Sequence, residues 1–332
     1  MGVYVGCIYR LALVSVGEIC YTGIKGGVGL ETAKIDSITR LRIHSDGTGV
    51  RSVVFLCGCP LNCFWCCNPE TRHGSHNREL TAEALYDYVK GDIPYFQASE
   101  GGITFSGGEP LLWTEFLRTF ILEYCQGFSV DMETSLHTSR QNLDTLIPLI
   151  GQWNVDFKVW DSEKHCSFTG QPNTLILDNL KYLASQIPTE RILVTYPVIP
   201  GYNDDDVNLK AMAGFLRENG ISRVEPHPYR KVCEEKHRRL GLSSPELEPI
   251  SEARFRSVLE RLRQYGMTIV MRRAPFGKEK CSYLKTLRRQ ICEREKLDVE
   301  IAECSQEEAC IGTCPRCEYE LKRIANALEE RK

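Results

Sequence analysis

The feature that most constrains the fold of this 332-residue chain is an alternation of short apolar segments with longer amphipathic ones, from about residue 51 to residue 271. The apolar segments are rich in β-branched and aromatic residues, a composition typical of buried strands. They cover residues 53–56, 103–105, 128–132, 155–159, 192–198 and 224–226. Helical patterns lie between them, at residues 82–90, 114–125, 143–150, 175–185 and 207–218, and a helix over 252–265 precedes a last strand over 267–271.

This alternation predicts parallel strands, because parallel neighbours need a long crossover connection that a helix can supply. The six strand–helix units are fewer than the eight of a closed barrel. The sequence therefore predicts an α/β fold with an open or partial (β/α)6 barrel. In such folds the functional residues gather in loops at the carboxyl ends of the strands.

Polar motifs follow the predicted strands at these ends. In chain order they are CGCPLNCFWC, SGGEP, ETS, DFKVWD, IPGYND and HPYRK. Loops at the carboxyl ends of parallel strands converge on one mouth of a barrel. The motifs therefore predict a single site there.

The first motif contains a cysteine triplet, Cys59-x3-Cys63-x2-Cys66. Thiolates are soft ligands that suit zinc, copper or iron–sulfur clusters. A structural zinc site takes four ligands, whereas three unevenly spaced cysteines fit a [4Fe–4S] cluster whose fourth iron stays open. Cys57 or Cys67 could supply a fourth ligand, so spacing alone leaves the metal undecided.

From about residue 43 to residue 271 the chain resembles the glycyl-radical enzyme activating enzymes of the radical S-adenosylmethionine (SAM) superfamily. The segment DGTGVRSVVFLCGCPLNCFWCCNPE resembles that family's opening strand and cluster loop, including the aromatic residue before the third cysteine. The resemblance implies a partial barrel of the radical SAM type and a [4Fe–4S] cluster on Cys59, Cys63 and Cys66 whose open iron binds SAM. Trp65 is then expected near the SAM adenine.

The implied reaction is reductive cleavage of SAM to a 5′-deoxyadenosyl radical, which abstracts a hydrogen atom. The cofactors carry this chemistry, while the protein supplies binding, geometry and a dry pocket. The resemblance further implies a flavodoxin- or ferredoxin-type electron donor.

The motif after the second strand places Gly107 and Gly108 before Glu109. Paired glycines permit close approach of the backbone to a ligand, and a glutamate can accept hydrogen bonds from an ammonium group. In the family this segment binds the SAM amino group. Glu133, at the end of the third strand, stands where the family has an acidic residue facing SAM.

The fourth strand ends in Asp156, Phe157 and Lys158, all of which are expected at the cofactor. Asp156 and Lys158 are two residues apart on a strand and therefore share one face. The lysine can pair with the SAM carboxylate. A salt-bridged strand end without a ligand is the alternative interpretation.

Three positions depart from the family pattern, and one of them is Cys233, which replaces a glycine. Arg230 stands where the family has a histidine that contacts SAM, and Thr195 stands where it usually has an arginine. An arginine can still bind ribose or carboxylate oxygens, so Arg230 is predicted to contact the cofactor. The mixed charges of residues 230–239 predict a solvated surface.

A second cysteine group lies near the end of the chain. It comprises Cys304, Cys310, Cys314 and Cys317. It could bind an auxiliary iron–sulfur cluster or zinc, or belong to a reduced tail. We expect an N-terminal extension over residues 1–40, the barrel domain over 41–275 and a small charged, cysteine-rich appendage over 276–332.

Composition narrows the class of protein further. The net charge of −3 argues against a nucleic-acid binder, and no apolar stretch is long enough for a membrane span. No basic segment precedes the apolar N-terminus, so a cytoplasmic location is expected. The 16 cysteines then indicate metal or redox chemistry rather than disulfides.

The resemblance implies a radical SAM oxidoreductase that takes a hydrogen atom from a glycine of a partner glycyl-radical enzyme. The alternative is a radical SAM enzyme that modifies a small molecule or peptide directly, with help from a C-terminal auxiliary cluster. A zinc module without catalysis is a third interpretation, which the GGEP and DFK motifs disfavour.

Overall fold

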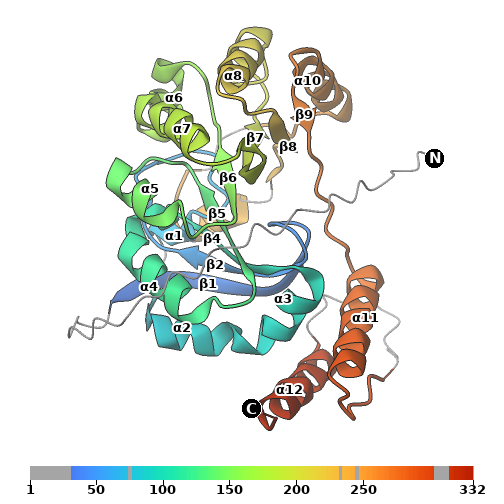
Figure 1. Cartoon of the computed structure of the whole chain (residues 1–332). Coiled ribbons are helices and arrows are strands. Elements are labelled where there is room, and N and C mark those ends of the chain that lie inside the picture. Colours follow the sequence, from blue (N-terminus) through green and yellow to red (C-terminus); the bar gives the residue numbers. More distant parts are fainter. Residues whose placement is uncertain (1–30, 74–76, 232–233, 244–246, 303–313, 332) are drawn as a thin grey trace. The chain divides into compact units, whose positions relative to one another are not determined.

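A nine-stranded sheet organises the part of the chain that the computed structural model describes, namely residues 31–73, 77–231, 234–243, 247–302 and 314–331 (Figure 1). The strands are β1 (Thr32–Ile43), β2 (Val50–Leu56), β3 (Arg78–Thr81), β4 (Gly102–Gly107), β5 (Ser129–Thr134), β6 (Gln152–Asp156), β7 (Ile192–Val198), β8 (Arg223–Pro228) and β9 (Thr268–Ile269). Their order is β3-β1-β2-β4-β5-β6-β7-β8-β9.

From β2 to β9 every pair of neighbouring strands is parallel. The predicted α/β fold with a parallel sheet is therefore confirmed, and each predicted strand overlaps an observed one. The helices that connect the strands are α2 (Ala82–Val89), α3 (Ile93–Ser99), α4 (Thr114–Tyr124), α5 (Arg140–Leu146), α6 (Ser162–Thr169), α7 (Thr174–Gln186), α8 (Asp206–Glu218) and α10 (Glu252–Gln264). Short helices α1 (Glu70–His73) and α9 (Glu234–Arg239) follow β2 and β8.

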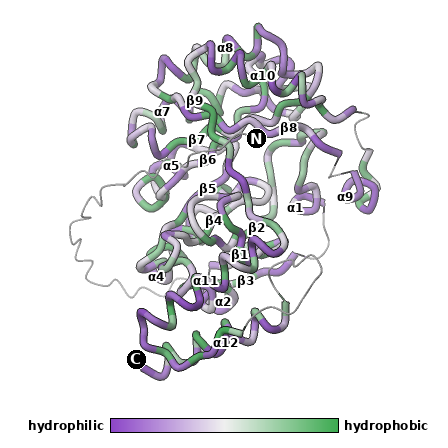
Figure 2. Tube along the Cα trace, turned by 90° about the vertical axis from the view of Figure 1, so that its right-hand side faces the viewer, coloured by the Kyte–Doolittle hydropathy of each residue, from purple (hydrophilic) through white to green (hydrophobic). Residues whose placement is uncertain are grey.

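The main hydrophobic core lies between the sheet and these helices. Its largest side chain, Trp153 on β6, has no solvent exposure, and Phe105 on β4 packs against Phe120 on α4. Each such side chain contributes about 1.5–3 kcal/mol by its burial. Figure 2 shows the apolar residues along the strands and polar ones on the outer helices.

β1 was not predicted. It pairs antiparallel with both β2 and β3, and its residues alternate between buried and exposed positions. The expected boundary at residue 40 falls inside this strand, whereas residues 1–30 lie outside the described part. β1 therefore covers the outer edge of β2, the strand that leads into the cysteine triplet.

The C-terminal segment contains two helices, α11 (Lys278–Arg294) and α12 (Pro315–Glu329). A second apolar core joins them to β1, β2 and α3; its buried members are Leu41, Ile43, Val50, Tyr95, Leu284, Leu287, Ile291, Cys292, Leu321 and Ile324. Arg288 and Glu320 form a buried ion pair with an N–O distance of 2.7 Å. None of the helices in the described ranges is long and apolar enough to cross a bilayer.

Candidate functional site

The cysteine triplet lies in the loop directly after β2, residues 57–69, here named the cysteine loop. Cys59, Cys63 and Cys66 are partly buried. A turn closes the second half of the triplet, because the Cys66 amide donates to the Cys63 carbonyl at 3.1 Å. This turn brings the second and third cysteines of the triplet close together.

The three thiols of the triplet differ from Cys57 in the charged groups that surround them. Burial raises the pKa of Cys59 to about 12 and of Cys66 to about 11, and it also raises the pKa of Cys63. Lys158 opposes this shift at all three thiols. Cys57 is 4% exposed, and the charges that act on its pKa are instead those of Asp36 and Lys34, which lie on β1. At neutral pH the three thiols therefore need a metal to replace their protons.

No group of three Cys, His, Asp or Glu side chains in the described ranges is already arranged around a single metal ion. A [4Fe–4S] cluster needs a different arrangement, because each thiolate binds a different iron and the three sulfur atoms lie apart. Three soft ligands close to the ammonium group of Lys158 fit such a cluster better than a single zinc ion.

The double glycine after β4 packs directly against the cysteine loop. A Cβ atom on Gly108 would lie 1.9 Å from the Gly58 carbonyl oxygen, and one on Gly107 would lie 2.4 Å from backbone atoms of Leu56. Gly107 also has a φ of +114°, which favours glycine. The amides of Gly108 and Glu109 donate to the carbonyls of Leu56 and Gly58 at 2.9 and 2.8 Å. Both glycines are therefore needed for loop packing, which is a role beyond the predicted ligand approach.

Glu109 is completely buried, and its carboxylate is fully used within the protein. It accepts hydrogen bonds from the Thr134 hydroxyl at 2.6 Å, the Ser135 amide at 2.9 Å, the Ser135 hydroxyl and the Leu111 amide at 3.2 Å. The carboxylate ties the loop after β4 to the end of β5. Any ammonium ligand at this segment would have to find a different acceptor.

Asp156 and Lys158 form an ion pair at the end of β6, with an N–O distance of 3.1 Å. The Thr195 hydroxyl donates to the other oxygen of Asp156 at 2.6 Å. Burial alone would raise the pKa of Asp156, but Lys158 and Thr195 together lower it. The Asp156 side chain is 45% exposed and Lys158 only 9%, so the carboxylate is the member of the pair that faces open space.

Phe157 points away from this pair. Its side chain is 2% exposed and belongs to the main core, because successive residues on a strand face opposite sides. A cofactor contact from Phe157, as predicted, could only come from its backbone.

Trp65 belongs to a small apolar cluster beside the triplet. It is 7% exposed and packs with Val159, Ile199 and Leu247, and its ring lies 4.7 Å from that of Phe64. These residues follow β2, β6, β7 and β8, so the cluster joins the segments after four strands. The cluster offers an apolar wall next to the three thiols.

Glu133 lies at the end of β5. Burial and the nearby Asp46 raise its pKa, while a hydrogen bond from Ser106 and the charge of Arg272 oppose the rise. A cation bound next to Glu133 would stabilise the charged form of its carboxylate, which burial and Asp46 disfavour.

Arg230 follows β8 and is exposed. It lines a cavity of about 500 Å³ between β8, β9 and α10, together with His227, Tyr229, Phe255 and Arg272. The structure thus places Arg230 on this cavity; its contact with a cofactor stays a prediction.

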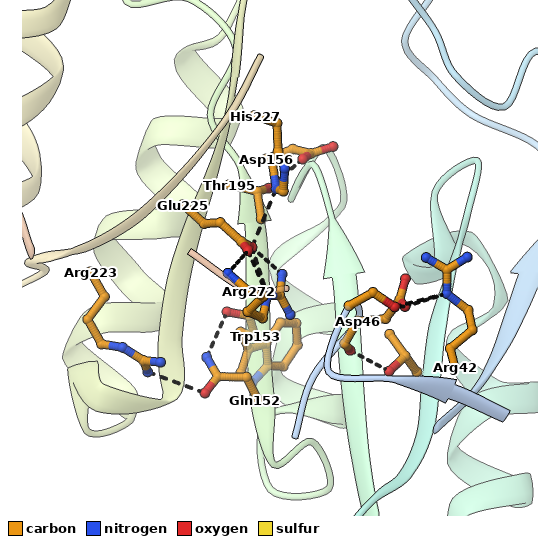
Figure 3. A network of polar contacts seen from close by, with 12 residues as sticks. Arg42, Asp46, Gln152, Trp153, Asp156, Thr195, Arg223, Glu225, His227 and Arg272 are labelled. Carbon is orange, nitrogen blue, oxygen red and sulfur yellow. Dashed lines mark hydrogen bonds and ion pairs between the residues drawn. The ribbon is translucent and has the colours of Figure 1, made fainter. Parts of the chain in front are cut away.

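Sequence reasoning missed three titratable residues of this region, which Figure 3 shows with Asp156 and Thr195. Glu225 and His227 are two apart on β8, and the strand period could have revealed their common face. Arg272 follows β9, and its guanidinium binds Glu225 with N–O distances of 2.8 and 3.0 Å. No local pattern marks that arginine.

We predict that Arg272→Met lowers the free energy of unfolding by about 3 kcal/mol at pH 7, because Glu225 then stays buried without the guanidinium group that binds it. Burial alone would raise the pKa of Glu225, but His227 and Arg272 lower it from 4.5 to about 2. The contribution of the pair is therefore complete above about pH 4.5 and is lost as the pH falls toward about 2.

Urea denaturation of both proteins between pH 7 and pH 3 tests this prediction, and the difference between them should shrink as the pH falls. The control is Arg273→Met, since Arg273 is 85% exposed and should matter by less than about 0.5 kcal/mol. If both variants lost the same free energy of unfolding, the stabilising role of the Arg272–Glu225 pair would be contradicted.

The geometry agrees with the chain's similarity to known proteins. Residues 53–212 match the family model described as the radical SAM superfamily. The chain is 26% identical to an indoleacetate decarboxylase activating enzyme from Tractidigestivibacter scatoligenes, over 75% of this chain and 100% of that one. It is 31% identical to a pyruvate formate-lyase-activating enzyme from Staphylococcus aureus (strain USA300), over 62% of this chain and 84% of that one.

Among solved structures, a radical SAM methyltransferase from Sphaerobacter thermophilus shares the fold with a TM-score of 0.51 and 18% identity, over 72% of this chain and 76% of that one. The parallel sheet, the cysteine loop and these matches define a radical SAM enzyme, a class that uses a [4Fe–4S] cluster and SAM. Within that class, the chain belongs to the family of glycyl-radical enzyme activating enzymes.

Proposed function

We propose that this protein activates a glycyl-radical enzyme by taking a hydrogen atom from one of its glycine residues. The observation that carries the proposal is the cysteine loop held against the double-glycine loop, in a chain that matches activating enzymes over most of their length. The bound cluster and SAM would supply the electron and the 5′-deoxyadenosyl radical. The remaining task of the protein is to bind, orient and exclude water.

Within this proposal each group at the mouth of the barrel has a role. Cys59, Cys63 and Cys66 hold the cluster. The Asp156–Lys158 pair and Glu133 place opposite charges where the carboxylate and ammonium groups of SAM would bind. These assignments are supported by the common position of the groups at strand ends and by the electrostatic link between Lys158 and the three thiols.

The Trp65 cluster provides the apolar surface for the adenine. Flavodoxin or ferredoxin is the proposed electron donor. No side chain at the mouth has to act as a general acid or base, because hydrogen-atom abstraction moves the proton and the electron together.

A second candidate function is direct modification of a peptide or small molecule. The cavity beside Arg230 favours it. So does the C-terminal cysteine group, of which Cys314 and Cys317 lie with their sulfurs 3.6 Å apart. Cys304 and Cys310 lie outside the described residues.

The test uses the anaerobically reconstituted full chain, dithionite and SAM, with a candidate partner deuterated at its glycine α-carbons. The proposal expects a glycine-centred radical by paramagnetic resonance and deuterium in 5′-deoxyadenosine. SAM cleavage without deuterium transfer from any such partner would favour the second function. About four irons per chain fit a single cluster, and about eight would indicate an auxiliary one.

A further inference from the structure

The cysteine loop is anchored at three places by different parts of the chain. Its start is fixed by Gly58, whose amide donates to the Thr71 carbonyl at 2.8 Å and whose carbonyl accepts from Glu109. In its middle, the amides of Asn62 and Phe64 donate to two carbonyls at the end of α6, at 2.5 and 3.2 Å. The end of the loop, with the third cysteine of the triplet, is held by α9.

Two neighbouring side chains of α9 make this third anchor. His237 is 5% exposed, and its Nε2 atom lies 2.9 Å from the carbonyl oxygen of Cys66. A carbonyl oxygen only accepts hydrogen bonds, so Nε2 must carry the proton. The Lys236 ammonium donates to the Cys67 carbonyl at 2.9 Å and pairs with Glu70 at 2.6 Å. Figure 2 shows α1, which contains Glu70, next to α9.

This contact joins elements that are distant in the sheet. The cysteine loop follows β2, whereas α9 follows β8, and β4, β5, β6 and β7 lie between those two strands. α9, in the connection from β8 to α10, therefore reaches the triplet that follows β2. Leu247 in the same connection packs in the Trp65 cluster. The prediction that residues 230–239 form a solvated surface is wrong for His237, because its imidazole has a buried hydrogen-bond partner.

Hydrogen bonds in the outer shell fix the orientation of metal ligands, and their loss typically reduces metal affinity or activity about 10–100-fold. A hydrogen-bond donor at the carbonyl of Cys66 restricts the orientation of the backbone that carries the Cys66 thiolate. An ammonium group beside the same loop adds positive charge near the cluster, which favours the reduced state.

We infer that His237 and Lys236 are positioning residues for the cluster: His237 fixes the third cysteine ligand, and Lys236 fixes the end of the loop and raises the reduction potential. This inference rests on the proposed function, because it takes Cys66 as a ligand. Both residues contact the cysteine loop through its backbone carbonyls.

The test compares His237→Leu with His237→Gln in the full chain, since a glutamine amide can place a donor near the position of Nε2. In the cluster-free protein, amide hydrogen exchange of the peptide spanning residues 59–70 should become faster in His237→Leu. In the reconstituted protein, the rate of iron loss to a chelator should rise about tenfold. His237→Gln should stay within about twofold of the wild type in both measurements.

Lys236→Gln should shift the midpoint potential of the cluster to a more negative value. Its control is Arg238→Gln, which removes a charge from the same helix at a side chain that is 75% exposed and pairs with Glu235. The control should leave the potential unchanged.

If His237→Leu had the amide exchange and the rate of iron loss of the wild type, the inference would be overturned. Equal increases in the leucine and glutamine variants would also overturn it, because they would show that the side chain acts only through its packing. Equal potentials in Lys236→Gln and Arg238→Gln would overturn the part that concerns Lys236. A wild-type protein that binds no cluster would instead contradict the proposed function, so the two failures can be told apart.

Discussion

Replacing Cys63 with serine is expected to remove the cluster and to reduce SAM cleavage by at least about 10³-fold, because the cluster that would pass the electron to SAM is then missing. A hydroxyl is a poor substitute for a thiolate as an iron ligand. Iron content should fall from about four atoms per chain to less than about one after anaerobic reconstitution. Methionine and 5′-deoxyadenosine released under dithionite measure the loss of activity.

Two other cysteines provide the controls for this experiment. Cys166 is exposed on α6, and Cys166→Ser should retain the iron and the activity of the wild type. Cys67→Ser tests the open iron, because Cys67 is the neighbour that could complete a four-cysteine site. Loss of the cluster in Cys67→Ser would show that all four irons have protein ligands, and the proposed chemistry would then lack a place for SAM.

Gly108→Ala is the second change with a large expected effect. The new methyl group would lie 1.9 Å from the Gly58 carbonyl oxygen, a backbone atom that cannot move without displacing the cysteine loop. Such overpacking should cost about 3 kcal/mol of the free energy of unfolding. A shift of the loop by about 1 Å should reduce SAM cleavage about 100-fold. Urea denaturation of the cluster-free protein and turnover of the reconstituted protein measure the two effects.

The matched control for this substitution is Gly214→Ala. Gly214 lies inside α8, and a Cβ atom there would meet nothing within 4 Å. This alanine should stabilise the helix by about 0.5–1 kcal/mol, since glycine is a poor helix former. If Gly108→Ala were as stable and as active as Gly214→Ala, the close contact between the two loops would be wrong.

Much of the parallel sheet could be predicted from the sequence. Short apolar runs separated by helical patterns predicted β2 and the strands from β4 to β9, and the polar motifs at their ends predicted where the site would form. β1 escaped prediction because its residues alternate in a weaker pattern within a segment assigned to an extension. Its role depends on antiparallel pairing with β2, which no local feature of residues 32–43 specifies.

The candidate site likewise has a part that could be predicted from the sequence and a part that only the fold shows. The triplet could be recognised because three thiols within eight residues carry their chemistry in their spacing. By contrast, Glu109 looked like a ligand for an ammonium group, and only the fold shows its carboxylate occupied by Thr134 and Ser135. A motif predicts which groups are present, and the three-dimensional neighbours decide which of them are free.

The sequence by itself determined the parallel α/β sheet, the order of its strands along the chain and the three thiols, because hydrophobic periodicity and short ligand spacings are local properties. Only the tertiary structure decided that His237 meets the carbonyl of Cys66, 171 residues away in the chain, and that Arg272 pairs with Glu225. Such partners are selected when the whole core packs, since a buried donor or charge is stable only beside the group that the fold brings to it.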